Sequence, residues 1–324
     1  MKNILITGGA GMIGSNLLKC LLRIGYNVKV VDNLYRGSLT NLEKAGLNLD
    51  CFLHYDLSRG YSDELKSFCS GIDVIYHLAD IVAGIDFVFN NEYDIFTENI
   101  KINMTIAEIV NQNINVKLIY AGTACSFPES LQDKYNQDHP LMEKDLFPAK
   151  PESGYGWSKL IGQIQYSYLK KKHNSDIITL MFHNVYGLPA DFSPERSQVI
   201  PSLIAKIHAL SDGDKLVVWG SGEQSRAFVH VDDICDALVS TLSLEKCELN
   251  EIQIGPTSSS TINDVARLLI GISGKKLTIE NDFSKPEGDK ARFSDNLLAK
   301  QLLGWSPKVD LKDGLEKMYK YYNE

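Results

Sequence analysis

The sequence lacks the long apolar segments and the basic surface that would assign it to membranes or nucleic acids. It contains no run of about 18 apolar residues, so no membrane-spanning helix is expected. Its 33 Lys and Arg residues are outnumbered by 41 Asp and Glu residues. A chain with a net charge of −8 has no excess of the cations that contact a nucleic-acid backbone. We therefore expect neither a membrane nor a nucleic-acid partner.

Paired cysteines and a leader-like segment are also missing. The cysteines form no CxxC pair, and no histidine stands at metal-ligand spacing from them, so no metal site is predicted. The first residues, MKNILITGGAG, have no basic region ahead of a hydrophobic one, as a secretory signal would. We expect a cytoplasmic protein in which most cysteines are small core residues; the cysteines are Cys20, Cys51, Cys69, Cys125, Cys235 and Cys247.

Short apolar runs alternate with helical patterns through the first half of the chain. Residues 13–24 have the spacing of an amphipathic helix, and similar patterns separate the later apolar runs. Apolar strands separated by helices are typical of a parallel sheet that is covered on both faces. The predicted strands are 3–7, 28–32, 51–54, 74–77, 117–121 and 177–182.

The pattern changes after about residue 185, where Pro and Gly become frequent and the elements shorten. We predict a large domain at 1–184 and a smaller, mixed α/β substrate-binding cap at 185–225 and 243–324. The segment 226–242 is predicted to return to the large domain as a strand and a helix.

A glycine-rich segment connects the first predicted strand to the first predicted helix. Gly8, Gly11 and Gly14 have the spacing with which a tight turn brings backbone N–H groups and a helix N-terminus to a pyrophosphate. Asp32 ends the next strand, where a carboxylate accepts hydrogen bonds from the adenosine ribose and repels a 2′-phosphate. The sequence therefore predicts a Rossmann-type, doubly wound α/β fold that binds NAD in preference to NADP, although Arg36 lies nearby.

Tyr155 and Lys159 have YxxxK spacing. If this segment begins a helix, the two side chains share a face. The Lys159 ammonium would then lower the pKa of the Tyr155 phenol and make it an acid–base group near neutral pH.

These motifs together resemble the extended short-chain dehydrogenase/reductase family over nearly the whole chain. The matching segments are TGGAGMIG, HLAD (77–80), AGTAC (121–125), YGWSK, HNVYG (183–187), WGSGEQSRAFVHVDD (219–233) and LGWSP (303–307). The resemblance implies that Tyr155 is the acid–base, Lys159 orients the nicotinamide ribose and Thr123 hydrogen-bonds the reacting sugar hydroxyl. It also implies a cofactor site comprising Gly8, Gly11, Met12, Ile13, Gly14, Asp32, Asn33, Arg36, Asp56, Leu57, Leu78, Ala79, Asn99, Tyr155 and Lys159.

Within this family the chain most resembles GDP-mannose 3,5-epimerase and GDP-fucose synthase, through residues 124–129, 182–187, 197–201 and 285–288. In those enzymes the cysteine that matches Cys125 moves a proton beside a transient C4 ketone, and a Lys or His acts from the other face. This chain has Ser193 and Gln198 at those partner positions, and neither is a useful proton donor near neutral pH. The resemblance also implies a nucleotide-sugar site at Asn184, Val199, Lys206, Arg226 and Arg292.

The incomplete proton-transfer pair favours one hypothesis over several others. We predict NAD-dependent oxidation at C4 of a GDP-linked manno-configured hexose or heptose, for surface-polysaccharide biosynthesis. A 3,5- or 4-epimerase with transient C4 oxidation, in which Cys125 works with a water or an unrecognised acid, is one alternative. A 4-keto-sugar reductase and a non-catalytic NAD-binding regulator are further alternatives. Dehydration is not favoured, because the nucleotide-sugar 4,6-dehydratases of the family that the chain resembles have carboxylates for the elimination of water where this chain has Ala124 and Cys125. By resemblance we expect a homodimer that pairs the helices near 95–113 and 155–172.

Overall fold

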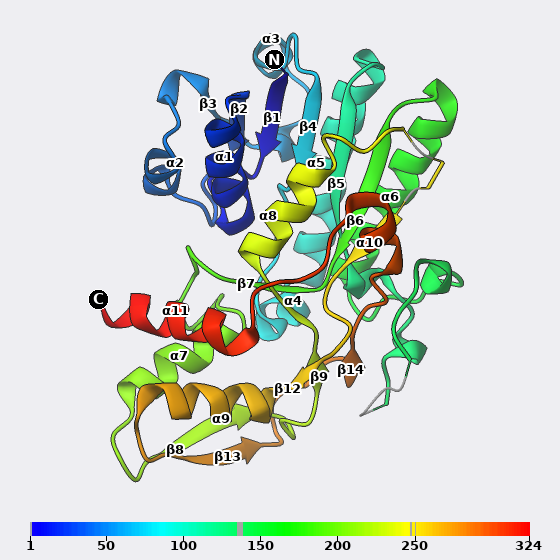
Figure 1. Ribbon diagram of the computed structural model, residues 1–324. Helices are drawn as coiled ribbons and strands as arrows, with labels where there is room; N and C mark the ends of the chain where they lie inside the picture. Colours follow the sequence, from blue (N-terminus) through cyan, green and yellow to red (C-terminus); the bar gives the residue numbers. More distant parts are fainter. Residues whose placement is uncertain (1, 135–138, 247, 250) are drawn as a thin grey trace.

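The computed structural model describes residues 2–134, 139–246, 248–249 and 251–324. Within these residues, seven parallel strands form one central sheet in the order β11-β6-β5-β4-β1-β2-β3 (Figure 1). The strand order reverses beside β1, so the predicted doubly wound, Rossmann-type fold is confirmed. The strands are β1 Asn3–Thr7, β2 Asn27–Asp32, β3 Phe52–His54, β4 Val74–His77, β5 Lys117–Thr123, β6 Ile177–Phe182 and β11 Glu251–Ile254.

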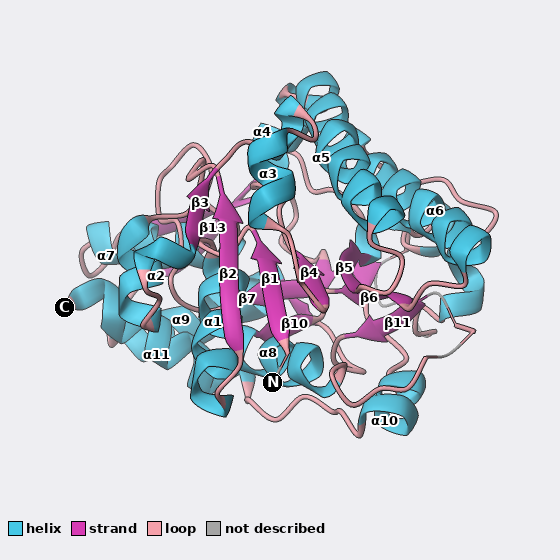
Figure 2. Ribbon diagram, turned by 90° about the horizontal axis from the view of Figure 1, so that it is seen from above, coloured by secondary structure: helices cyan, strands magenta, loops and turns pink. Residues whose placement is uncertain are grey.

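Alternating side chains of the central strands fill two separate cores, one on each face of the sheet. On β1, Ile4 and Ile6 belong to one core and Leu5 belongs to the other. Because both faces are covered, the strand is apolar at every one of these positions. Figure 2 shows α1 and α8 on one side of the sheet and α5 and α6 on the other. The helices around the sheet are α1 Met12–Ile24, α2 Leu39–Ala45, α3 Asp63–Phe68, α4 Ile85–Asn90, α5 Glu92–Gln112, α6 Gly154–His173, α8 Val231–Ser240 and α10 Leu297–Leu303.

The remaining elements form a smaller layer below the carboxyl ends of the strands (Figure 1). Helices α7 Val199–Ala209, α9 Ile262–Ser273 and α11 Leu311–Asn323 bury their apolar faces against one another and against β8 Lys215–Trp219. Strand β8 pairs in parallel with β13 Thr278–Asp282. Short strands join this layer to the sheet domain: β7 Asn184–Tyr186, β9 Ser225–Arg226, β10 Phe228–His230, β12 Ser260–Thr261 and β14 Ala291–Arg292.

One strand of the central sheet lies inside the range that we assigned to the cap. Strand β11 pairs with β6 from Glu251 opposite Thr179 to Ile254 opposite Phe182, so the assignment of 243–324 to the cap is wrong for this segment. Its sequence EIQI alternates polar with apolar residues, unlike the continuous apolar runs of the inner strands. Helix α10, later in the chain, contacts β11 and α8, and Trp305 packs into the same core as α1 and α8.

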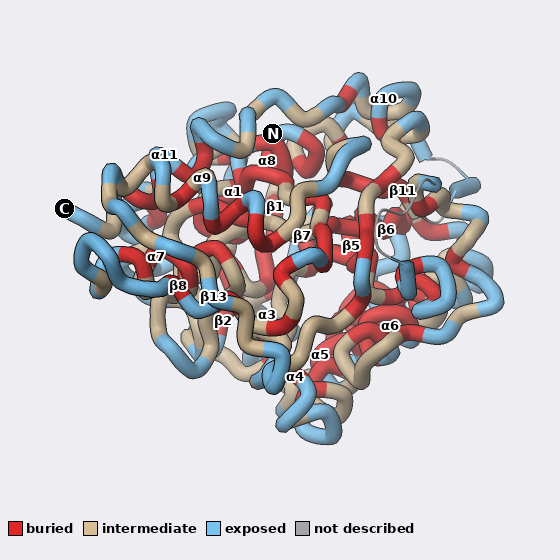
Figure 3. The backbone as a smooth tube through the Cα atoms, turned by 90° about the horizontal axis from the view of Figure 1, so that it is seen from below, coloured by how far each residue is buried: buried red, intermediate tan, exposed pale blue. Residues whose placement is uncertain are grey.

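The buried parts of the chain coincide with the sheet and with the inner faces of its helices (Figure 3). Of the cysteines, Cys69 and Cys235 are buried, whereas Cys20, Cys51 and Cys125 are half-buried. Cys247 lies outside the described residues. None of the helices in the described residues is both long and apolar enough to cross a membrane.

The close contact between β1 and α1 supplies a test of the fold. A Cβ on Gly14 would lie 2.3 Å from the Gly8 carbonyl oxygen, whereas a Cβ on Gly271 of α9 would meet no atom within 4 Å. We expect Gly14→Ala to lower the free energy of unfolding by about 1–3 kcal/mol. Gly271→Ala should raise it by about 0.5–1 kcal/mol, because alanine is the better helix former. The midpoints of urea unfolding measure both changes; a Gly14→Ala midpoint equal to that of the unmodified protein would contradict the close approach.

Candidate active site

A cavity of about 1310 Å³ lies at the carboxyl ends of the central strands. Its wall contains residues that follow or end four neighbouring strands, among them Gly8, Asp32, Leu78 and Thr123, and it continues to Arg226 and Arg292 of the cap side. Ligands of open α/β sheets bind at this edge, beside the point where the strand order reverses. Every residue that we predicted for the cofactor, for catalysis or for substrate lines this cavity, with the exception of Asn99.

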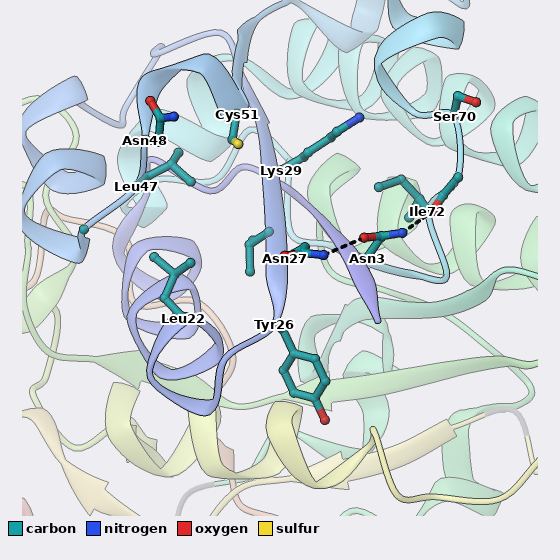
Figure 4. A pocket seen from close by; sticks show the side chains of 13 residues that line it. Asn3, Leu22, Tyr26, Asn27, Lys29, Leu47, Asn48, Cys51, Ser70 and Ile72 are labelled. Atoms are coloured by element: carbon teal, nitrogen blue, oxygen red, sulfur yellow. Dashed lines mark hydrogen bonds between the residues drawn. The ribbon is translucent and has the colours of Figure 1, made fainter. Parts of the chain in front are cut away.

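A smaller cavity of about 490 Å³ lies at the opposite edge of the sheet, where β1 and β2 begin (Figure 4). Asn3 and Asn27 in its wall bond to each other, and Lys29 donates to the Phe68 carbonyl. This cavity lies away from the carboxyl ends, so the larger cavity is the candidate site.

The glycine-rich turn forms a cradle at the start of α1. Gly8 has a left-handed φ of +70°, and a Cβ there would lie 2.8 Å from the Ala79 nitrogen. Gly11 is the N-cap of α1 and makes no side-chain cap bond, so side chains leave the first N–H groups of the helix to a ligand. This geometry fits a pyrophosphate, as the sequence indicated.

The residues at the far end of this cradle are held by the backbone. Asp32 accepts from the Ala10 N–H at 2.9 Å and from the Leu34 N–H at 2.7 Å. Burial raises the pKa of Asp32, and the two N–H donors partly offset this rise. Arg36 donates to the Val82 carbonyl and lies 3.9 Å from Asp191, so its charge is engaged inside the protein. The Asp191 carboxylate makes Arg36 a weaker site for a 2′-phosphate, which agrees with a preference for NAD, although the buried Nε of Arg36 has no hydrogen-bond partner among the described residues.

Asn99 has a different position from the one that we expected for a cofactor contact. It is buried, accepts from the Ile81 N–H at 2.7 Å and donates to the Ile81 carbonyl at 3.2 Å. Its amide also donates to Ser158 of α6 at 3.3 Å. Because these bonds use the side chain to hold the loop after β4 against α6, Asn99 stays away from the cavity wall.

Helix α6 places Tyr155 and Lys159 in its first two turns. The hydroxyl of Ser153 caps this helix by accepting from the Gly156 N–H, so the helix begins just before Tyr155. The predicted sharing of one helix face follows from this start. Thr123, at the end of β5, lines the same cavity and lies close enough to Tyr155 to lower its pKa.

The carboxylate of Asp80 changes the electrostatics that we predicted for Tyr155 and Lys159. The Lys159 ammonium lies 2.9 Å from Asp80 Oδ2, and the Tyr155 hydroxyl lies 3.5 Å from the same oxygen. The pKa of Tyr155 is raised well above its usual value, first by burial and next by the charge of Asp80. The lowering that we expected from Lys159 is therefore not seen, because burial and the charge of Asp80 raise the pKa of Tyr155 instead.

A buried chain of hydrogen bonds connects the glycine-rich turn to α6. Thr7 and His77 Nδ1 lie 2.8 Å apart, and His77 Nε2 lies 3.1 Å from Asn103 Oδ1. Burial, followed by the charge of Lys159, lowers the pKa of His77 to about 3, so the ring is neutral. The Asn103 amide donates to the Ser158 carbonyl at 3.5 Å. His77 is thus a positioning residue between β1, β4 and the helices that carry the site.

Cys125 is the second residue after β5 and lines the same cavity as Asp80. Arg292 donates from Nη1 to its sulfur at 2.9 Å and also contacts Asp289 and Gln132. The nearby negative charges outweigh burial and raise the pKa of Arg292. Arg292 was predicted to belong to the nucleotide-sugar site; its guanidinium is buried and paired with Asp289.

A second arginine and two carboxyl groups complete this cluster. Arg226 donates to the Asp289 carbonyl at 2.6 Å. Burial, followed by the charge of Asp289, raises the pKa of Glu152 to about 7. Asp289 Oδ1 is buried and has no hydrogen-bond partner among the described residues, so a proton on Glu152 would provide it with a donor.

The remaining predicted substrate residues occupy the cap side of the cavity. Asn184 Oδ1 is buried without a partner among the described residues, which fits an acceptor for a ligand. Lys206 lies on α7 next to Val199 and donates to the Val217 carbonyl at 3.1 Å. Gln198 lines the cavity, whereas the buried hydroxyl of Ser193 does not.

Three acidic residues of the site were missed or left undecided by the sequence: Asp80, Glu152 and Asp289. Asp80 and Glu152 act through partners far away in the chain, Lys159 and Asp289, so no local spacing marks them. Asp289 pairs with Arg292 three residues later, a spacing that the sequence does not distinguish from an ordinary surface pair. The described residues contain no cluster of His, Cys, Asp and Glu that could hold a metal ion.

Comparison with known proteins identifies the family. The model of the NAD dependent epimerase/dehydratase family matches residues 4–255. Two rice (Oryza sativa subsp. japonica) proteins are each 28% identical over 99% of the chain. They are GDP-mannose 3,5-epimerase 1, with 82% of its length covered, and probable GDP-L-fucose synthase 1, with 92% covered.

The fold comparison points in the same direction. The crystal structure of UDP-glucuronic acid 4-epimerase from Bacillus cereus, in complex with UDP-glucuronic acid and NAD, has a TM-score of 0.84. It is 29% identical in sequence and is matched over 99% of both chains.

Proposed function

Because the chain belongs to the NAD dependent epimerase/dehydratase family, we propose that it oxidises C4 of a GDP-linked manno-configured hexose or heptose. The product would be a 4-keto sugar for surface-polysaccharide biosynthesis. NAD, the cofactor of this family, accepts a hydride when bound. The cradle at Gly8, Gly11 and Gly14 fits its pyrophosphate, and Asp32 lies at the end of the cavity where its ribose would be held.

The observation that carries this proposal is the arrangement of proton-handling groups. Tyr155, Lys159 and Thr123 converge on one part of the cavity, where Tyr155 would take the proton of the C4 hydroxyl and Thr123 would position that hydroxyl. The two positions at which the related epimerases carry a second acid have Ser193 and Gln198 here. Neither side chain titrates near neutral pH, which favours release of the ketone over a second proton transfer.

The nucleotide would lie against the cap. Arg226 and Arg292 border the cavity with the planar, multi-donor geometry that suits a diphosphate, and Asn184 offers an unpartnered oxygen. The rice relatives that act on GDP-sugars support guanine, and Val199 and Lys206 of α7 would face the base.

One observation favours an epimerase as the second candidate. Glu152, with a pKa of about 7, lies in the same charged cluster as Cys125 and Arg292 and could supply a missing proton. Transient oxidation at C4 followed by proton exchange at a neighbouring carbon would then complete an epimerisation.

Incubation with GDP-, UDP- and dTDP-sugars in deuterated water separates these candidates. We expect one GDP-sugar to lose two hydrogens while reduced nicotinamide accumulates, as measured by mass spectrometry and absorbance. Tyr155→Phe should lower this rate at least about 100-fold because it removes the acid–base hydroxyl. Deuterium uptake without net oxidation would instead identify an epimerase, and the absence of both with every sugar would refute the proposal.

The pKa of Glu152 predicts how nucleotide-sugar binding depends on pH. Below pH 7 the carboxyl is neutral, and above pH 7 its negative charge opposes an anion at Arg226 and Arg292. We expect the Kd of GDP-mannose, whose diphosphate does not titrate here, to rise about fivefold from pH 6 to pH 8.5, or about 1 kcal/mol. Calorimetric titration measures it. Glu152→Gln should flatten the profile, the exposed Glu129→Gln should not, and an unchanged profile in Glu152→Gln would contradict the assignment.

We also propose a homodimer through α5 and α6. Tyr93 and Met104 share one face of α5, Trp157, Ile161 and Tyr168 share one face of α6, and all five are exposed. Ile161→Arg should convert the dimer to a monomer in sedimentation velocity, because a buried charge opposes association. Phe283→Arg, at an exposed position of the cap, is the matched control; dissociation by both variants, or by neither, would contradict this interface.

A further inference from the structure

Asp80 stands at the centre of the candidate catalytic groups. It is the third residue after β4, and its Oδ2 lies 2.9 Å from the Lys159 ammonium and 3.5 Å from the Tyr155 hydroxyl. The Lys159 side chain is 2% exposed and that of Asp80 is 16% exposed. An ion pair with so little water around it is weakly screened, so the carboxylate acts strongly on both neighbours.

The backbone on both sides of Asp80 is fixed. The Leu78 N–H donates to the Thr7 carbonyl at 3.1 Å, and the Ala79 N–H lies 3.4 Å from the Thr7 hydroxyl. On the other side, Asn99 makes two hydrogen bonds with the backbone of Ile81. Asp80 is therefore held in place between two clamped residues rather than carried on a free loop.

We propose that Asp80 is a positioning residue that sets the pH at which Tyr155 exchanges its proton, by compensating the charge of Lys159 and accepting from the Tyr155 hydroxyl. This inference rests on the proposed function, because it concerns the acid–base step of that reaction.

The other groups that face Tyr155 do not reproduce this effect. Burial is the largest cause that raises the pKa of Tyr155, and Asp80 is the next. Cys125 and Tyr120 raise this pKa less than Asp80 does, whereas a hydrogen bond with Thr123 lowers it. A cation such as Lys159, one turn further along α6, would favour the phenolate. Tyr120 lies under the ammonium, with Lys159 Nζ 4.5 Å from its ring centre. Removal of the Asp80 charge should therefore release the ammonium to stabilise the phenolate.

The consequence for the reaction has a defined sign. Oxidation requires Tyr155 as the phenolate, which takes the proton from the sugar hydroxyl, and reduction of a ketone requires it as the phenol. Asp80 favours the phenol. Asp80 therefore shifts the pH at which the oxidation rate rises to a higher value. It also widens the pH range in which Tyr155 keeps the proton that the reverse reaction, reduction of the ketone, requires.

The first test needs neither cofactor nor substrate. Tyr155 ionisation is followed by the tyrosinate difference spectrum, with each protein compared with its own Tyr155→Phe counterpart. In Asp80→Asn and Asp80→Ala the midpoint should fall by at least about one pH unit relative to the unmodified protein. Asp86→Asn, in α4 at the wall of the same cavity, should leave it unchanged. Equal midpoints in both Asp80 variants and the unmodified protein would overturn the proposal.

The second test uses turnover of the GDP-sugar identified above. The acidic limb of the pH profile of kcat/KM for oxidation should move down by about one unit or more in both Asp80 variants, but not in Asp86→Asn. An unmoved limb in folded Asp80→Ala would count against Asp80 as the residue that sets this pH. If the unmodified protein oxidised no sugar, the proposed function would fail, while the spectroscopic titration would still decide the role of Asp80.

Discussion

The site depends on one buried chain of polar contacts, from Thr7 through His77 to Asn103 and the backbone of α6. A neutral imidazole with both nitrogens engaged can connect two elements only in one orientation, so the chain fixes the distance between the glycine-rich turn and the catalytic helix. Burial, which keeps His77 uncharged, is supplied by Tyr120 and Tyr166, whose rings pack on the imidazole. The packing of these rings beside the sheet therefore also holds the polar groups of the site in place.

The two halves of the cavity are built on different physics. In the cofactor half, backbone groups do most of the work: the turn approaches so closely that a Cβ on Gly14 would overlap the Gly8 carbonyl, and Asp32 is held by two N–H groups. In the substrate half, side-chain charges dominate, since Arg226 and Arg292 lie among Asp289, Glu152 and Cys125. Binding by backbone N–H groups does not change with pH. Binding by a cluster of charges that includes Glu152, whose pKa is about 7, changes with pH near neutrality.

This difference explains how much of the protein could be predicted from its sequence. The inner strands and the glycine turn follow from local patterns, because continuous apolar runs and fixed glycine spacing are properties of one segment. Strand β11 was not predicted, because Glu251 and Gln253 interrupt its apolar residues. The role of Asp80 could not be predicted, because its effect depends on Lys159, which only the tertiary fold brings to it. The contacts of Asn99 could not be predicted for a related reason, since its amide is used by the Ile81 backbone.

Charge compensation connects these observations to function. Lys159 is paired with Asp80, Arg292 with Asp289, and Arg36 is close to Asp191, so these three cations of the cavity have carboxylate partners. Arg226 instead donates to backbone carbonyls. A compensated cation costs less to bury than a lone one, which allows a dry site to form without its ligands. An anionic ligand must then compete with an internal carboxylate for each cation, and the outcome depends on whether that carboxylate can take a proton. Glu152 lies beside the two arginines and provides such a group, so proton uptake and nucleotide binding are expected to be linked at this end of the site. At the other end, Asp80 links the charge of Lys159 to the proton of Tyr155.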